Sequence, residues 1–423
     1  MTLNIAIVGG GLGGLAAALF LRRAGVQATV YEQATQLRET GAGIVVPPNM
    51  VRLLAELGLA EPLRRVAVQL EAAWEFRRWQ DGRVLFVQAM GGECERLYGA
   101  HCFVAHRADL LTVLQDALGA APLRLDHRCT SVHEVGDGVD IHFERRDGSR
   151  NVAPADAVIG ADGIHSVVRK GTAPDVEARF SGLCAFRCLV PAAAAPPMAL
   201  RPVQTLWLGP GRHLVHYPIS AGRLVNIVAI VPAGDWQGES WTADGDVLDL
   251  QKAFSGWDAH EHRLQALLAA ATETKRWALV DRTPLPRWTE GRVSLLGDAA
   301  HPMLPFYAQG AAQAIEDAAV LADCLAGVSA AQVPQSLQRY EARRRPRASQ
   351  VQLMSRGREL RNHLPDGPEQ VERDAGFARG DPLRQSAWLY GTTCARTQRQ
   401  AERAERHESP KALASQPQKR CCK

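Results

Sequence analysis

The chain has 423 residues, of which 46% are hydrophobic and 22% are charged. This composition is typical of a globular protein, and the length is sufficient for two domains with sizeable cores. The formal net charge is +4, but eight lysines and arginines against three glutamates lie after residue 391, so the rest of the chain is close to neutral. A basic tail without interleaved aromatic residues is typical of a solvated end, which excludes a nucleic-acid-binding function.

The cysteines and the N-terminus predict where the protein resides. The first predicted strand begins almost at Met1, which leaves no room for a signal peptide. The first predicted helix, Leu12–Ala24, is too short to cross a bilayer. The nine cysteines form no CxxC pair and no metal-ligand spacing, and their odd number favours reduced thiols. We therefore expect a cytoplasmic protein without a bound metal or a membrane partner.

The N-terminal residues predict a dinucleotide-binding turn. An apolar, β-prone run, Asn4–Val8, is followed by Gly9, Gly11 and Gly14 in a G-x-G-x-x-G pattern, and then by a helix rich in alanine and leucine. The glycines allow a tight turn and close approach of the backbone to a pyrophosphate, which the helix N-terminus attracts. Glu32 ends the next strand, in the position of an acid that binds ribose hydroxyls. Packing of a small-residue helix on a sheet would not explain Glu32, so dinucleotide binding is favoured.

Helices and strands continue to alternate after this unit, and a different pattern follows. The first half is expected to contain a Gly/Pro loop at Thr40–Pro48, a helix at Asn49–Gly58, paired strands within Trp74–Val87, a helix opening at His106–Asp109, strands between Leu123 and Phe143, and a short strand at Ala157–Ile159. The second half is expected to contain an antiparallel meander (Val203–Leu208, His213–Ile219, Leu224–Val231), helical segments over Val247–Trp277, a strand at Val293–Leu296, and helices at Gly310–Ala326 and Val333–Leu360.

This order predicts an α/β fold in which one nucleotide-binding domain is built from three separated pieces. We expect a Rossmann-like domain with a mostly parallel sheet over residues 1–69, 101–175 and 287–330. An inserted antiparallel-sheet substrate domain is expected over 70–100 and 176–286, followed by a C-terminal helical region over 331–391. Residues 392–423 are of low complexity and are expected to be a disordered basic tail.

Three motifs together resemble a known family. The motifs are GGGLGG with Glu32, GADGIHSVVR at Gly160–Arg169, and LLGDAAHPMLP at Leu295–Pro305. Together they resemble the single-component flavoprotein aromatic hydroxylases, which are FAD-dependent monooxygenases of the p-hydroxybenzoate hydroxylase fold. Within this family, two further stretches are most similar to the branch of salicylate hydroxylases, 3-hydroxybenzoate 6-hydroxylases and 6-hydroxynicotinate 3-monooxygenases. These stretches are HLVHYPI and DRTPLPRWTEGRVSLLGDAAHPM. The resemblance covers about Leu3–Gly391. It implies noncovalent FAD, NADH or NADPH as cosubstrate, and molecular oxygen.

The resemblance also implies which residues contact the flavin. Asp298 is expected at the ribityl chain, and the helix that starts at Gly310 and Ala311 is expected to direct its N-terminus at the flavin ring, where its dipole stabilises the reduced anion. Three further positions are carried over: Asp162 from the DG motif, Arg107 at a helix start, and Val45 in the loop along the flavin face. An Asx turn at Asp162 and a solvated Arg107 are the structural alternatives.

A polar pair in the meander is expected to face the substrate. Because alternate residues of a strand share a face, His213 and Tyr217 lie on one side and His216 on the other. In the family a flavin hydroperoxide is the electrophile, and the ring becomes nucleophilic once its phenol proton is withdrawn. A histidine with an ordinary pKa of about 6.5 can accept that proton at neutral pH. His213 and Tyr217 are therefore the expected catalytic residues.

The substrate is expected to be a small aromatic acid of the salicylate or 3-hydroxybenzoate type. Hydroxynicotinate-type relatives carry a histidine in the loop where Val45 and Val46 stand here, which disfavours a hydroxypyridine carboxylate without excluding it. No second G-x-G-x-x-G is present, so NAD(P)H is expected to dock transiently. An FAD oxidase or reductase and a flavin redox sensor remain alternatives, because both would share the flavin motifs. The oligomer considered is a homodimer.

Overall fold

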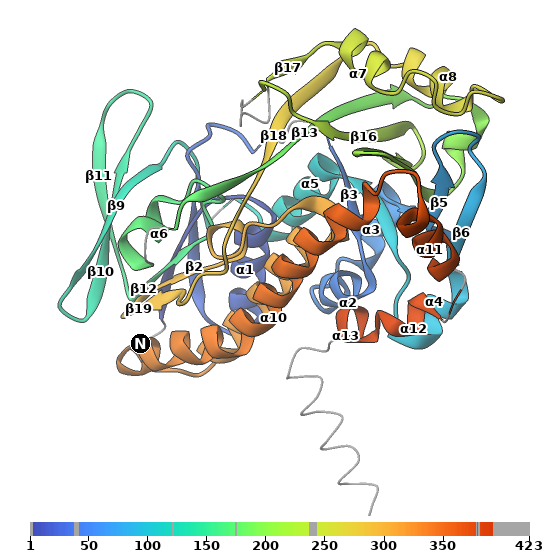
Figure 1. Cartoon of the computed structure of the whole chain (residues 1–423). Coiled ribbons are helices and arrows are strands. Elements are labelled where there is room, and N and C mark those ends of the chain that lie inside the picture. The colour runs from blue at the N-terminus through green and yellow to red at the C-terminus, as the bar shows by residue number, and fades with distance from the viewer. Residues whose placement is uncertain are drawn as a thin grey trace, which may run out of the picture.

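The computed structural model describes residues 3–37, 42–120, 122–173, 176–236, 243–377, 379 and 381–391 (Figure 1). The expected tail, residues 392–423, lies wholly outside the described residues. The expected loop at Thr40–Pro48 is described only from residue 42. The helices are α1 (Leu12–Arg23), α2 (Pro48–Glu56), α3 (Ala60–Val66), α4 (Gly91–Tyr98), α5 (Arg107–Leu118), α6 (Val167–Thr172), α7 (Val247–Ala253), α8 (Arg263–Ala269), α9 (Gly310–Leu325), α10 (Val333–Asn362), α11 (Pro368–Phe377), α12 (Pro382–Gln385) and α13 (Ala387–Tyr390).

A six-stranded, mostly parallel sheet carries the glycine-rich turn. Its order is β19 (Thr289–Glu290), β20 (Val293–Leu295), β12 (Ala157–Gly160), β1 (Asn4–Val8), β2 (Gln27–Tyr31) and β8 (Leu123–Arg124), and only the β19–β20 pair is antiparallel. β1 and β12 are apolar and buried because helices cover the sheet. The alanine-rich α1 packs closely on α9. The three sequence pieces expected to form one parallel sheet therefore lie together.

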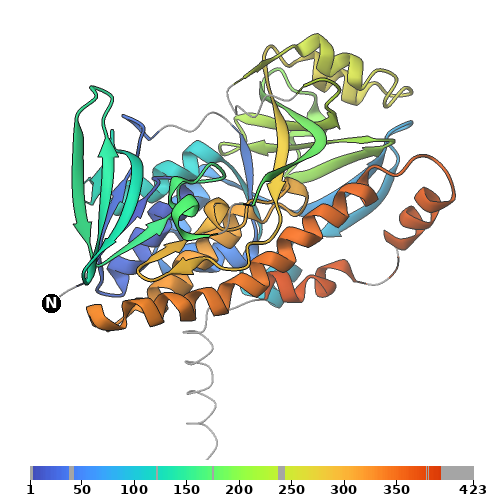
Figure 2. The ribbon, with the colours of Figure 1, turned by 60° about the vertical axis from the view of Figure 1, so that its left-hand side comes forward.

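Two three-stranded sheets flank this unit. β9 (Arg128–Val135), β10 (Gly138–Glu144) and β11 (Arg150–Ala155) form an antiparallel sheet that stands out at one side of the molecule in both ribbon views (Figures 1 and 2). β3 (Gly43–Val46), β7 (Phe103–His106) and β4 (Val68–Gln69) form the other. The loop predicted at Val45 is therefore wrong. Val45 lies in β3, where the β-branched run Ile-Val-Val pairs with β7.

An eight-stranded sheet contains the predicted meander. Its order is β17 (Asp244–Gly245), β18 (Thr274–Arg282), β13 (Ala178–Pro191), β16 (Leu224–Pro232), β15 (Arg212–Ile219), β14 (Val203–Gly209), β5 (Ala72–Arg78) and β6 (Val84–Ala89). The pairs are antiparallel except β14–β5. Helices α7 and α8 lie at its outer side, opposite the β9–β11 sheet (Figure 1). The helical prediction over Val247–Trp277 is wrong at its end, because the β-prone residues of β18 pair with the edge of the long strand β13.

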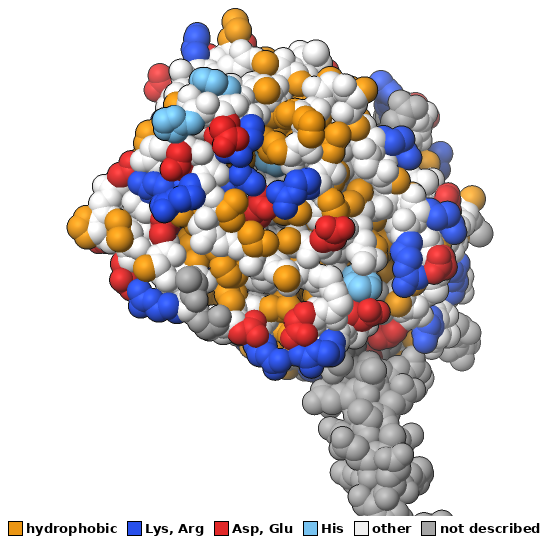
Figure 3. All heavy atoms as spheres, turned by 90° about the vertical axis from the view of Figure 1, so that its right-hand side faces the viewer, with side chains coloured by type: hydrophobic (Ala, Val, Ile, Leu, Met, Phe, Trp, Pro, Cys, Tyr) orange, Lys and Arg blue, Asp and Glu red, His pale blue; other side chains and the backbone are white. Residues whose placement is uncertain are grey.

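The last strand of this sheet, β6, is an edge strand with exposed Val84 and Val87. On the face that carries β5 and β6, hydrophobic side chains gather in a band between charged groups (Figure 3). An exposed edge strand is a place at which a second chain can add. The expected homodimer stays a prediction.

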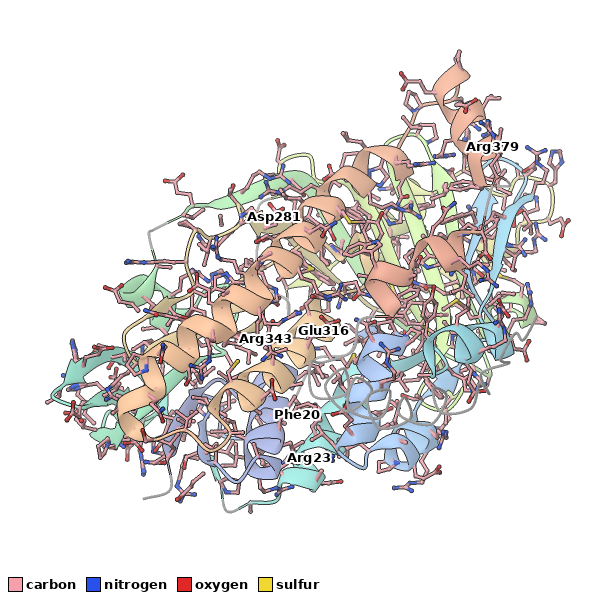
Figure 4. All side chains as sticks on the ribbon, turned by 90° about the horizontal axis from the view of Figure 1, so that it is seen from below. Phe20, Arg23, Asp281, Glu316, Arg343 and Arg379 are labelled. Atoms are coloured by element: carbon pink, nitrogen blue, oxygen red, sulfur yellow. The ribbon has the colours of Figure 1, made fainter. Side chains whose placement is uncertain are left out.

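The long helix α10 connects the two large sheets. In its first half Arg344 makes ion pairs with Glu316 (2.8 Å) and Asp317 (2.7 Å) of α9. In its second half Arg356 pairs with Asp281 of β18 at 2.6 Å. Figure 4 shows Glu316 and Asp281 at separate points along this helix. Both carboxylates are buried, so α10 holds the parallel and the antiparallel sheet in a fixed relation.

Candidate active site

A cavity of about 640 Å³ lies between the parallel sheet and the meander. Its walls include the glycine turn at one end and strands β13 to β16 at the other, with the Leu296–Ala311 segment between them. This size is within the range of small-molecule and cofactor sites. The predicted residues that line it are Gly9, Gly11, Glu32, Val45, Arg107, Asp162, His213, Tyr217, Asp298, Gly310 and Ala311. The fold thus brings residues from distant parts of the chain to one space.

The glycine turn is shaped by close backbone contacts. Gly9 has φ +111°, and a Cβ there would lie 2.3 Å from the carbonyl oxygen of Ala161. A Cβ on Gly14 would lie 2.0 Å from the carbonyl oxygen of Gly9, so this glycine permits α1 to pack on β1. Gly11 faces open space, with no atom within 4 Å of an added Cβ, and no side chain caps the N-terminus of α1. The uncapped N-terminus of α1 therefore borders open space at Gly11 that has room for an anion.

Glu32 shapes the turn as well as facing the cavity. Its two carboxylate oxygens accept hydrogen bonds from the backbone N–H of Gly10 (2.7 Å) and of Ala34 (2.8 Å). A carboxylate has about four acceptor positions, so these bonds leave capacity for ribose hydroxyls. The role of Glu32 toward a nucleotide stays a prediction.

The carboxylate of Asp162 is hydrogen-bonded to residues at the start of α6. Its carboxylate accepts hydrogen bonds from Ser166 Oγ (2.6 Å), Val167 N (2.7 Å) and Val168 N (3.2 Å). These bonds help to cap α6, whose N-cap residue is Ser166, and they run to residues farther along the chain than the Asx turn that was the structural alternative. Burial raises the pKa of this carboxyl, and the hydrogen bonds oppose that shift. Asp162 also lines the cavity, so its contact with a cofactor stays a prediction beside the capping role.

A buried cluster around Asp317 contacts the segment that contains Asp298. Asp317 of α9 accepts hydrogen bonds from Gly297 N (3.0 Å), and its carboxylate lies 2.6 Å from His301 Nε2. Burial alone would raise the pKa of Asp317, but His301 and Arg344 outweigh it and lower the pKa to about 2. Asp298 itself is exposed among buried neighbours. Within the part of the chain that the structure describes, no hydrogen bond or ion pair occupies its carboxylate, so it is presented to the cavity.

The start of α9 and two further residues complete the nucleotide end. No side chain caps the N-terminus of α9, where Gly310 and Ala311 line the cavity. Arg107 is the first residue of α5, and its backbone N–H bonds to Ala42 O at 2.9 Å. Val45 lies on β3, paired with Val104 of β7. All four positions line the cavity, Val45 from a strand instead of the predicted loop, and their contacts with a cofactor stay predictions.

The meander presents the expected polar pair. His213, Val215 and Tyr217 of β15 line the cavity, whereas Leu214 belongs to the core under α7 and α8. His213 is 3% and Tyr217 4% exposed. A Cβ on Gly43 would lie 2.7 Å from Tyr217 Cε2, so a glycine is required where β3 passes this ring. The alternation of side chains along β15 therefore directs His213 and Tyr217 toward the cavity.

The expectation that His213 has an ordinary pKa is wrong. Burial, followed by the proximity of His363 and Arg358, lowers the pKa of His213 well below its usual value. Burial also raises the pKa of Tyr217. Near neutral pH His213 is consequently an uncharged imidazole and Tyr217 a neutral phenol. His213 is suited to accept a hydrogen bond or to pass a proton on, but not to store one.

Two residues that the sequence did not indicate line this wall, Gln204 of β14 and Arg187 of β13, and a third, His363 after the end of α10, contacts His213 without lining the cavity. Gln204 lines the cavity, is 5% exposed, and its Oε1 has no hydrogen-bond partner among the described residues. Arg187 lines the cavity with its guanidinium 4.2 Å from the Trp277 ring centroid. His363 Nε2 lies 2.6 Å from His213 Nδ1. The strand alternation could have identified Gln204, but no local pattern marks the other two.

Comparisons with known proteins agree with this geometry. A family model described as an FAD binding domain matches residues 2–355. The chain is 43% identical over 388 residues to 3-amino-4-hydroxybenzoate 2-monooxygenase of Streptomyces platensis, covering 92% of this chain and 96% of that protein. It is 37% identical over 356 residues to 6-hydroxynicotinate 3-monooxygenase of Pseudomonas fluorescens, covering 83% and 90%.

Solved structures show the same fold. The crystal structure of Klebsiella pneumoniae HpxO complexed with FAD and uric acid matches with a TM-score of 0.80 and 28% identity, over 92% of this chain and 96% of that one. A substrate complex of salicylate hydroxylase matches with a TM-score of 0.78 and 28% identity, over 95% and 98%. The fold and the cavity thus define an FAD-dependent flavoprotein. The chain belongs to the FAD-binding family of aromatic-ring monooxygenases that includes the salicylate, 3-hydroxybenzoate and 6-hydroxynicotinate hydroxylases, as the motifs predicted.

The residues present at the nucleotide end suit FAD. The open space at Gly11 and the uncapped N-termini of α1 and α9 offer backbone donors to a pyrophosphate and to an anionic ring. The free carboxylate of Asp298 offers acceptors to hydroxyl groups between these two ends. No helix in the described part of the chain is long and apolar enough to span a membrane.

Proposed function

We propose that this monooxygenase consumes NADH or NADPH and hydroxylates a small phenolic aromatic acid, with an aminohydroxybenzoate as the first candidate substrate. The observation that carries the proposal is the polar wall opposite the flavin end of the cavity. It combines His213 and Tyr217 with the amide of Gln204 and the guanidinium of Arg187. Together these four groups match the carboxylate, the phenol and the amino group of such a ring.

The cofactor residues follow from the shape of the nucleotide end. Gly11 and the α1 N-terminus would hold the pyrophosphate, Glu32 the ribose hydroxyls, and Asp298 the ribityl chain, while α9 would direct its positive end at the ring. When bound and reduced, FAD would activate molecular oxygen for transfer of one oxygen atom to the ring. The side chains of this chain would orient the substrate and exclude water from it.

The substrate residues have distinct roles in this proposal. Arg187 would bind the carboxylate, because a guanidinium is a strong charge-assisted donor to a carboxylate. Tyr217 would donate its hydroxyl hydrogen to the phenol oxygen, and His213 would accept the phenol proton. Loss of that proton makes the ring electron-rich and therefore reactive toward an electrophile. The lowered pKa of His213 favours the neutral form that can accept the proton.

Gln204 supports an amine-bearing substrate over the salicylate or 3-hydroxybenzoate type expected from the sequence. The register pairs Thr205 of β14 with His216 of β15, so the adjacent position brings Gln204 beside Tyr217 on the same face. A buried amide oxygen without a partner costs free energy unless a donor reaches it. An amino group next to the phenol would be such a donor. The high identity to 3-amino-4-hydroxybenzoate 2-monooxygenase supports the same choice.

The decisive experiment measures oxygen uptake by FAD-loaded protein with NADH or NADPH. The panel contains 3-amino-4-hydroxybenzoate, 4-hydroxybenzoate, salicylate, 3-hydroxybenzoate and 6-hydroxynicotinate, with hydroxylated product and hydrogen peroxide measured together. We expect stimulated uptake with stoichiometric product for the aminohydroxybenzoate. Uptake that yields only peroxide with every compound would indicate an oxidase, and no stimulation by any aromatic would indicate a redox sensor. Turnover of 6-hydroxynicotinate alone would establish the hydroxypyridine alternative.

A further inference from the structure

Two histidines from distant parts of the chain form one hydrogen-bonded pair at the substrate wall. His213 Nδ1 lies 2.6 Å from His363 Nε2, and the ring centroids are 4.9 Å apart. His213 is buried and lines the cavity. His363 follows the last residue of α10 and is only partly buried. The pair therefore extends from the cavity toward the surface.

The position of His363 is fixed by several elements. Its backbone oxygen accepts a hydrogen bond from Gly211 N at 3.0 Å, in the turn that precedes β15. Three residues beyond it, Asp366 accepts hydrogen bonds from Arg78 (3.1 Å) and Gln80 (2.9 Å) of the β5–β6 hairpin region. Phe306 packs on both imidazoles, with centroids 5.6 Å from His213 and 6.1 Å from His363. The contact between the two rings is thus part of a built structure.

The hydrogen bond constrains which nitrogen of His213 carries a proton. A neutral imidazole has one N–H donor and one acceptor nitrogen. Two neutral imidazoles that share a bond place one proton between them. If His213 Nδ1–H is the donor and His363 Nε2 the acceptor, His213 Nε2 is left as an acceptor for the substrate.

We propose that His363 is a positioning residue that holds His213 in this tautomer and relays the substrate proton to solvent. The proposal rests on the proposed function, which supplies the phenol. The phenol O–H bond breaks as its proton bonds to His213 Nε2. The Nδ1 proton of His213 passes to His363 Nε2, and the Nδ1 proton of His363 passes to water. When the hydroxylated product regains its proton, the same transfers run in reverse and restore both rings.

The charges around the pair favour relay over storage. Arg358 of α10 faces His213, and Arg373 of α11 faces His363. Arg78 of β5 is paired with Asp366 and Asp374. Burial and Arg373 lower the pKa of His363 to about 4, and burial, His363 and Arg358 lower that of His213. Neither ring retains a second proton near neutral pH, so a proton taken from a phenol must leave.

The tautomer can be tested without any substrate. In the full-length, FAD-loaded protein labelled with ¹⁵N-histidine, NMR should show His213 protonated at Nδ1 and unprotonated at Nε2. His363→Leu should remove this preference and give a mixture of tautomers. A wild-type spectrum with the proton on His213 Nε2 would overturn the proposal, whatever the enzyme's substrate is.

The relay is tested by proton release on anaerobic mixing of FAD-loaded protein with 3-amino-4-hydroxybenzoate, followed with a pH-indicator dye. His363→Gln keeps a hydrogen bond to His213 but cannot pass a proton, so binding should persist while release slows by roughly tenfold or more. His363→Leu should slow release and also weaken binding. His260→Gln, the same change at an exposed site, should release protons at the wild-type rate.

The two possible failures give different results. Release at the wild-type rate from both His363→Gln and His363→Leu would overturn the relay. A wild-type protein that binds no phenol and shows no stimulated NAD(P)H oxidation would instead overturn the proposed function. The tautomer measurement would still decide whether His363 positions His213.

Discussion

The two ends of the cavity present different kinds of groups. The glycine turn and the starts of α1 and α9 present backbone N–H groups, which short contiguous motifs place there. The substrate wall presents side chains from separate strands, brought together by the register of β13 to β16. A backbone donor survives most substitutions, whereas a side chain does not. This difference explains how relatives with different named substrates can share one fold and one cofactor.

Replacing His213 should separate the two ends most strongly. His213→Ala should retain the FAD spectrum, because β15 lies apart from the glycine turn. Hydroxylation should fall by roughly 10²–10⁴-fold, the usual effect of removing a positioned base. The measurement is the ratio of hydroxylated product to NAD(P)H consumed, with peroxide as the remainder. Tyr217→Phe should show a milder loss, and a wild-type ratio and rate in both variants would show that this strand face is not catalytic.

Asp317 holds the segment next to Asp298 through Gly297, and its replacement should lower the free energy of unfolding. Asp317→Asn should cost roughly 3 kcal/mol, because buried His301 loses its carboxylate partner and buried Arg344 keeps only that of Glu316. With a pKa of about 2 in the folded state and about 3.9 in the unfolded chain, the carboxylate stabilises fully above about pH 4. That contribution is lost as the pH falls through about 2.

Chemical unfolding at neutral and acidic pH tests this. The difference between wild type and Asp317→Asn should shrink as the pH approaches 2, whereas the exposed Asp235→Asn should match wild type throughout. Equal stability of Asp317→Asn and wild type at neutral pH would show that the cluster does not support the fold.

Asp298 tests whether the exposed carboxylate serves the cofactor. Asp298→Ala should weaken FAD binding by roughly 10–150-fold, which corresponds to the 1.5–3 kcal/mol of a charge-assisted hydrogen bond. The thermal stability of the FAD-free protein should be unchanged, because this side chain is exposed. Fluorescence titration with FAD measures the change, with Asp235→Ala as the control. Unaltered affinity would reduce Asp298 to a turn residue.

Gln204 should have the smallest effect, confined to the substrate. Gln204→Leu should reduce the preference for 3-amino-4-hydroxybenzoate over 4-hydroxybenzoate by roughly 2–10-fold, the range of one neutral hydrogen bond. The ratio of kcat/KM values for the two acids measures this preference. Gln385→Leu makes the same change at an exposed position of α12 and should leave the ratio intact. An unchanged ratio in Gln204→Leu would mean that another group contacts the amine.

Local backbone requirements made much of the fold predictable. The G-x-G-x-x-G turn is confirmed by the contacts at Gly9 and Gly14, where any side chain would collide with backbone. The meander is confirmed by the antiparallel pairing of β15 with β14 and β16, and β15 has one face in the core and one on the cavity. The predictions at β3 and β18 were wrong for a shared reason. Short segments rich in β-branched and aromatic residues take their structure from the edge that they pair with, here β7 and β13.

By itself the sequence determined the FAD-binding fold, the family and the inward face of His213 and Tyr217. These depend on residues close together in the chain, whose spacing dictates a turn, a helix start or a strand face. Only the tertiary structure decided that Gln204 and Arg187 share the wall with them, that burial lowers the pKa of His213, and that His363 lies against it. His213 and His363 are 150 residues apart. No local pattern encodes such a contact, because it arises only when α10 packs across both sheets.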